Sequence, residues 1–120
     1  RIGWGDAEAG ALDQQRQVAA ESRDLSLVAK AKYNIGNYLF EEGRRQMDSD
    51  LQKSVGSLQS AIENWRAVLE LEPQNAKAHK NIEAAKLLLK QILDEQKKRQ
   101  QNQDPNSAGQ QNKQQDNQQQ

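Results

Sequence analysis

The sequence predicts an all-α fold, an antiparallel stack of helical hairpins with elongated helices. Three observations lead to this prediction. Apolar residues recur at alternating spacings of three and four over long segments, the period of an amphipathic helix. Pro73 breaks this pattern within "LELEPQNAKA", so two helices can turn back on each other there. No strand pattern and no β-hairpin turn signal occurs along the chain.

The helices around Pro73 are predicted at residues 50–72 and 76–98. Ser49 and Gln52 match a capping box for the first of them, and Asn75 can cap the second. The two apolar stripes consist of Leu51, Val55, Leu58, Ile62, Trp65 and Leu69, and then of Ala78, Ile82, Ala85, Leu89 and Ile92. Matched lengths and a short turn predict an antiparallel hairpin.

Two further helices are predicted upstream, at residues 7–22 and 25–46. Either Asp24 or Ser26 can cap the second of them, and Gly43 is a candidate terminator. Gly36 lies inside this helix at a cost of about 1 kcal/mol relative to alanine, which favours close approach by a neighbouring helix.

Composition limits the chain to one thin helical domain, residues 1–99, followed by a tail. Residues 100–120 hold ten Gln and four Asn with a single aliphatic side chain, too little apolar surface to offset chain entropy. We therefore expect a disordered Gln/Asn-rich tail. The chain starts at Arg1, which predicts a piece of a longer protein or a processed form.

Charge and residue usage exclude several classes of function. The formal net charge is zero, so no overall field attracts nucleic acid or anionic lipid. There is no cysteine, which removes thiolate nucleophiles and the strongest zinc signatures. The longest purely apolar run is three leucines, too short for direct membrane insertion.

Catalytic and metal chemistry has little support in the sequence. His79 is the only histidine, and Glu83 follows one helical turn later, which leaves open a hydrogen bond or a weak metal site. Two ligands do not make a zinc site, and a surface histidine near a turn accounts for the same residues. No phosphate-binding glycine loop, G-x-S-x-G or H-E-x-x-H motif occurs. We predict that the chain is not an enzyme and holds no metal or cofactor.

Three segments resemble parts of the tetratricopeptide repeat (TPR). "AKYNIGNYLFEEG", residues 31–43, resembles the first helix of a repeat, and "SAIENWRAVLELEPQNAKA" resembles its second helix and exit. "AHKNIEAAKLLL" is similar to the opening of another repeat, with Ile82 in the place of Ile35. These isoleucines are 47 residues apart against a usual period of 34, which predicts lengthened helices.

The segments "YNIGN", "WRAVLELEP" and "NIEAAKLLL", followed by a Gln-rich tail, look most like the TPR proteins of the Bat (Bacteroides aerotolerance) group. This resemblance implies a bacterial scaffold that associates with von Willebrand factor type A (VWA) domain proteins and a MoxR-type ATPase. It also implies a location in the cell envelope, on the periplasmic side of the inner membrane.

The TPR resemblance implies that first-helix residues line a concave face that binds a partner. The matching positions are Asn34, Asn37, Lys77, Lys80 and Asn81. Amides offer both a donor and an acceptor to an extended peptide, and lysines add charge pairing. Ordinary surface positions or helix-to-helix hydrogen bonds would account for the same residues. Trp65 and Tyr33 are expected in the core, whereas Trp4 is expected to be exposed.

The sequence therefore predicts a noncatalytic, monomeric protein-protein interaction module of about one and a half TPR units. A self-associating helical bundle or coiled coil is the alternative, because the stripes at 51–69 and 78–92 could pair between chains.

Overall fold

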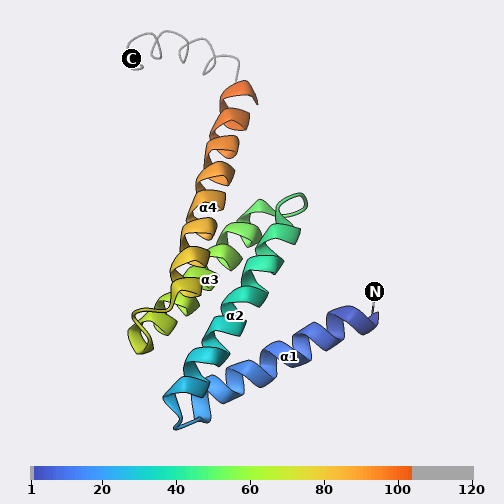
Figure 1. Cartoon of the computed structure of the whole chain (residues 1–120). Coiled ribbons are helices and arrows are strands. Elements are labelled where there is room, and N and C mark those ends of the chain that lie inside the picture. Colours follow the sequence, from blue (N-terminus) through green and yellow to red (C-terminus); the bar gives the residue numbers. More distant parts are fainter. Residues whose placement is uncertain (1, 104–120) are drawn as a thin grey trace. The chain divides into compact units, whose positions relative to one another are not determined.

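The protein is all-α, as the sequence predicts. The computed structural model describes residues 2–103, with side chains for residues 9–102. The described residues form four helices and no strand: α1 (Ile2–Glu21), α2 (Leu25–Gln46), α3 (Leu51–Leu71) and α4 (Ala76–Gln103) (Figure 1). The chain divides into two compact units, Arg1–Leu89 and Lys90–Gln120. The first unit contains α1 to α3 and the first half of α4.

Short turns join consecutive helices within the first unit. α2 and α3 run antiparallel and pack along their length, and α1 packs against α2 (Figure 1). Pro73 lies in the turn between α3 and α4, where the helix break was predicted. The result is a series of helical hairpins.

Side-chain caps begin three of the helices. Asp24 Oδ1 accepts hydrogen bonds from the backbone N–H groups of Ser26 (3.0 Å) and Leu27 (3.4 Å), so Asp24 is the cap of α2. Asn75 caps α4 as predicted, accepting from Ala78 N at 2.9 Å. The capping box predicted at Ser49 and Gln52 is wrong. Asp50 has extended backbone, with φ −152° and ψ 91°, and its carboxylate accepts from Lys53 N at 3.1 Å instead.

Two helices are longer than predicted. α1 begins at Ile2 and not at residue 7, and α4 continues to Gln103 and not to residue 98. Residues 100–103 are therefore helical and do not belong to the predicted tail, because glutamine is a good helix former and Pro105 is the first breaker. The second half of α4 is also supported by an ion pair between side chains one helical turn apart, Lys90 and Asp94, at 3.0 Å. The rest of the tail lies outside the described residues, as does the side chain of Trp4.

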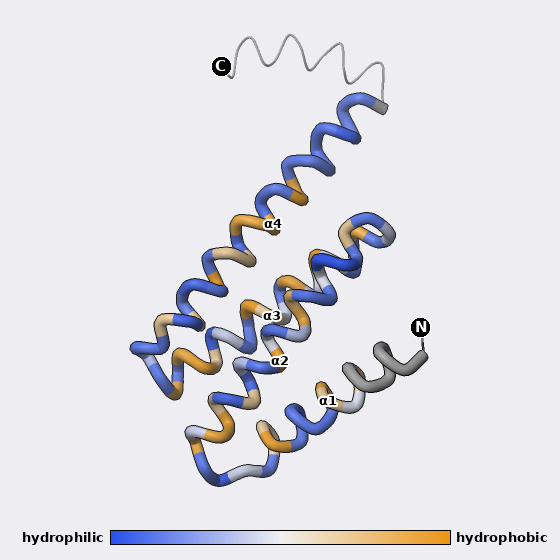
Figure 2. Tube along the Cα trace, turned by 45° about the vertical axis from the view of Figure 1, so that its right-hand side comes forward, coloured by the Kyte–Doolittle hydropathy of each residue, from blue (hydrophilic) through white to orange (hydrophobic). Residues whose placement is uncertain are grey.

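Trp65 is the largest side chain in the core of the first unit. It is 1% exposed and belongs to a buried cluster drawn from α2, α3 and α4. The apolar residues of α2 and α3 gather where these helices face each other (Figure 2). The buried cluster consists of Ala29, Ala61, Ile62, Trp65, Val68, Ala78, Ile82 and Ala85. The predicted core position of Trp65 is confirmed.

Two glycines allow α2 to approach α3. A Cβ atom on Gly36 would lie 2.6 Å from Cδ1 of Trp65, so the predicted close approach at this residue is confirmed. Gly43 is not the helix terminator that the sequence suggests, because α2 continues to Gln46. A Cβ on Gly43 would instead lie 2.7 Å from Cγ of Leu58, so the glycine makes room for that side chain.

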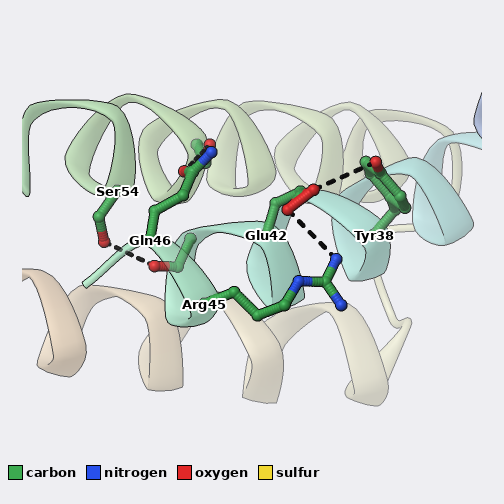
Figure 3. Close-up of polar contacts among 7 residues, drawn as sticks. Tyr38, Glu42, Arg45, Gln46 and Ser54 are labelled. Atoms are coloured by element: carbon green, nitrogen blue, oxygen red, sulfur yellow. Dashed lines mark hydrogen bonds and ion pairs between the residues drawn. The ribbon is translucent and has the colours of Figure 1, made fainter. Parts of the chain in front are cut away.

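Polar contacts support the far end of this hairpin. Ser54, fully buried on α3, donates to the carbonyl of Gly43 at 2.7 Å (Figure 3). On α2, Tyr38 donates to Glu42 at 3.3 Å, and Arg45 pairs with the same carboxylate at 3.2 Å. The buried hydrogen bond satisfies a carbonyl in the last turn of α2, where no helical N–H follows.

None of the helices in the described part of the chain has the length and apolar character needed to cross a bilayer.

We expect Gly36→Ala to destabilise the fold by about 1–3 kcal/mol, because the added methyl group overlaps the Trp65 ring and overpacks the core. Urea unfolding followed by circular dichroism measures the change. Gly56→Ala is the matched control, since nothing lies within 4 Å of a Cβ there and alanine favours the helix by about 1 kcal/mol. Equal stability of the Gly36→Ala variant and the wild type would contradict the described contact.

Candidate functional site

The candidate site is the seam between α2 and the first half of α4. Asn81 of α4 donates through Nδ2 to the Tyr33 hydroxyl (3.2 Å) and to Asn37 Oδ1 (3.3 Å), both on α2. Residues 44 and 48 positions apart thus meet across the seam. The core positions this seam, because Ile82 and Ala85 hold α4 against the Trp65 cluster and turn Asn81 toward α2.

One side of this amide contact is a depression of about 340 Å³, which we call the aromatic depression. It is lined by Asn37, Phe40, Glu41, Trp65, Asn81 and Ala84. The Phe40 ring is half-buried and tilted at 46° to the Trp65 ring, with centroids 5.8 Å apart. The depression therefore combines an apolar, aromatic wall with two side-chain amides.

On the other side lies a depression of about 390 Å³, which we call the lysine depression. It is lined by Ser26, Ala29, Lys30, Tyr33, Asn34, Glu72, Asn75 and Lys77. Glu72 accepts a hydrogen bond from Asn75 at 2.9 Å. We call the two depressions together the α2/α4 groove.

The structure brings four of the five predicted binding residues to the α2/α4 groove. Asn37 and Asn81 line the aromatic depression and are hydrogen-bonded to each other. A hydrogen bond between helices, the alternative role considered for these residues, is therefore present. Asn34 and Lys77 line the lysine depression. Lys80 is exposed on α4 and lines neither depression. Binding by any of the five stays a prediction.

Sequence reasoning missed Lys30, Phe40 and Glu41 as lining residues. Each lies three or four positions from Asn34 or Asn37, on the same helix face. This spacing from the predicted binding residues was the sequence signal that could have identified them as lining residues. Tyr33 was expected in the core and is half-buried at its edge, with its hydroxyl at the seam.

His79 is exposed and anchors the turn before α4. Its Nε2 lies 2.9 Å from the carbonyl oxygen of Pro73, which can only accept, so Nε2 carries the donated proton. Glu83 pairs instead with Lys86 at 3.6 Å. Among the side chains of residues 9–102, no three His, Asp or Glu residues gather closely enough to hold a metal ion.

The groove side chains are amides, aromatic rings, lysines, carboxylates and a serine hydroxyl. Hydrogen bonding, charge pairing and apolar contact are the chemistry that this set offers to a ligand. That the chain is not an enzyme stays a prediction.

We predict that Asn37 and Asn81 are energetically coupled, by about 0.5–1 kcal/mol in a double-mutant cycle with alanine, because they share a half-buried hydrogen bond. Chemical unfolding of the two single variants and the double variant measures the coupling. Asn37 with Asn64 is the control pair, since Asn64 bonds to the Ser60 carbonyl on α3. A coupling no larger than in the control pair would refute the contact.

No family model, no curated protein and no solved structure matches the chain. These comparisons therefore identify no family for it, and its similarity to TPR proteins of the Bat group stays a prediction from the residues alone.

Proposed function

We propose that the chain is a noncatalytic protein-interaction module that binds an extended segment of a partner protein in the α2/α4 groove. The observation that carries this proposal is the arrangement of Asn37 and Asn81. Their mutual hydrogen bond uses Oδ1 of Asn37 and Nδ2 of Asn81. Within the described side chains, Asn37 Nδ2 and Asn81 Oδ1 have no hydrogen-bond partner. One donor and one acceptor thus remain beside an aromatic wall.

A donor next to an acceptor is complementary to the C=O and N–H groups of an extended peptide. The Asn81 side chain is already held by Tyr33 and Asn37, so little rotamer freedom is lost when a peptide binds. The aromatic depression can then accept one large apolar side chain of the same segment against Phe40 and Trp65.

Magnitudes indicate weak binding by this site alone. Burial of one large apolar side chain contributes about 1.5–3 kcal/mol. Two hydrogen bonds add about 0.5–1.5 kcal/mol each. The sum of about 2.5–6 kcal/mol corresponds to a Kd between about 15 mM and about 40 μM, before ordering costs are subtracted. A partner that binds tightly must therefore use additional surface.

The resemblance to Bat-group TPR proteins supports a more specific partner. On that basis we propose that the module belongs to a bacterial membrane-associated complex that contains a VWA-domain protein and a MoxR-type ATPase. A weak, open groove suits a scaffold whose contacts add together in an assembly.

The groove is tested with a displayed library of random peptides, selected on the full chain and remeasured by calorimetry. We expect Asn37→Ala to weaken the selected peptides about tenfold, through loss of the donor and of the Asn81 contact. Gln59→Ala, an exposed change on α3, is the control and leaves binding unchanged. Failure to select any peptide, or equal binding by the Asn37→Ala variant, would overturn the groove assignment.

The partner is tested by co-elution of the chain with the VWA domain of a Bat protein from the same organism in size-exclusion chromatography. We expect a one-to-one complex with the wild type, and with Asn37→Ala a complex that dissociates at about tenfold higher concentration. An elution profile that the substitution leaves unchanged at every concentration would place the contact outside the groove. Absence of co-elution would remove the VWA partner and leave the peptide proposal standing. A concentration-dependent dimer of the chain alone would favour the self-associating bundle.

A further inference from the structure

We propose that the α2/α4 groove selects an extended segment that carries a large apolar side chain and, about four residues away, an acidic side chain. This inference rests on the proposed function, since it defines the chemistry of the segment that the groove binds. Its basis is the different character of the two depressions at either side of the Asn37 and Asn81 contact.

The aromatic depression is electrostatically neutral. Glu41, its only charged lining residue, is paired with Arg44 at 3.4 Å. The Arg44 guanidinium also lies 5.9 Å from the centre of the Phe40 ring. With its charge compensated and its wall formed by Phe40, Trp65 and Ala84, this depression favours an apolar side chain.

The lysine depression carries excess positive charge. Among the side chains that the structure describes, neither Lys30 nor Lys77 has an ion-pair partner, although other charged residues on α2 and α4 do. The one carboxylate in the lining, Glu72, is hydrogen-bonded to Asn75. Two ammonium groups against one carboxylate attract an anionic group, even though the net charge of the chain is zero.

Helix geometry gives the distance between the two preferences. Lys30 and Phe40 are ten positions apart on α2, and Lys77 and Ala84 are seven apart on α4. At 1.5 Å per residue these separations are about 15 Å and about 10 Å. An extended segment advances about 3.3 Å per residue, so three to five residues cover this distance. On both helices the lysine precedes the apolar residue in the sequence. Both helices therefore place the lysine depression toward their N-terminal ends and the aromatic depression toward their C-terminal ends.

The surface favours an acidic side chain within a passing segment over a terminal carboxylate. Asn34 lines the lysine depression and also a smaller depression between α1 and α2, whose other lining residues are Ala11, Leu12, Gln15 and Tyr38. The hollowed surface therefore widens toward α1 at Asn34, which leaves room for further residues of the segment beside the lysine depression. No arginine lines the lysine depression to grip a terminal carboxylate with two parallel hydrogen bonds.

The test uses acetylated, amidated peptides of serine and glycine with one Phe and one Glu at separations of one to eight residues. Binding to the full chain is measured by NMR titration. We expect the lowest Kd at separations of three to five residues. Replacing Glu by Gln in the best peptide weakens binding about fivefold, the effect of an exposed ion pair worth up to about 1 kcal/mol. A peptide that ends in a free carboxylate in place of the Glu binds more weakly than the internal-Glu peptide.

Variants of the protein assign the effect to the two lysines. Lys30→Met with Lys77→Met removes the difference in Kd between the Glu and Gln peptides. Lys53→Met, an exposed lysine on α3, is the control and retains the difference.

The outcomes separate the two proposals. Equal binding of Glu and Gln peptides, or no preferred separation between Phe and Glu, would refute the acidic preference. The proposed peptide groove would still stand if binding of these peptides depends on Asn37. Tighter binding of the terminal carboxylate would overturn the internal acidic residue. No binding by any peptide would refute both.

Discussion

The packing of the Trp65 indole on the bare backbone of Gly36 is the constraint on which the rest of the structure depends. The indole lies where a side chain on residue 36 would have to be, and its N–H donates to the Tyr33 carbonyl at 3.2 Å. A large ring is thus buried with its polar atom satisfied. The same contact sets the rotation of α2 about its axis, and this rotation places Tyr33, Asn37 and Phe40 along the seam with α4.

Much of this core consists of small residues. Ala29, Ala61, Ala78 and Ala85 are each 0–1% exposed, so the helices approach closely around a single large ring. Alanines contribute little buried area each, so the apolar contribution to stability is modest for a fold of this length. Hydrogen bonds between helices therefore matter more than usual. Ser54 to Gly43 supports one end of the α2 and α3 hairpin, and Asn81 links α4 to α2.

Charge pairing divides the surface in a way that the net charge of zero conceals. The carboxylates near the C-terminal end of α2, Glu41 and Glu42, are paired with Arg44 and Arg45 one turn later. Lysines near the start of α2 and α4 have no such partners among the described side chains. Paired charges are solvated and contribute little to recognition, whereas unpaired lysines beside a depression are available to a ligand.

The sequence by itself determined what depends on near neighbours along the chain. The 3.6-residue period predicted four helices and a buried Trp65, Pro73 placed the break between the last two, and Asn75 provided the cap. Only the tertiary structure decided what depends on distant residues: that Gly43 makes room for Leu58, and that Asn81 meets Tyr33 and Asn37. A groove with an aromatic end and a lysine end exists only because packing around one tryptophan sets two helix faces at a particular rotation, and no local pattern records that rotation.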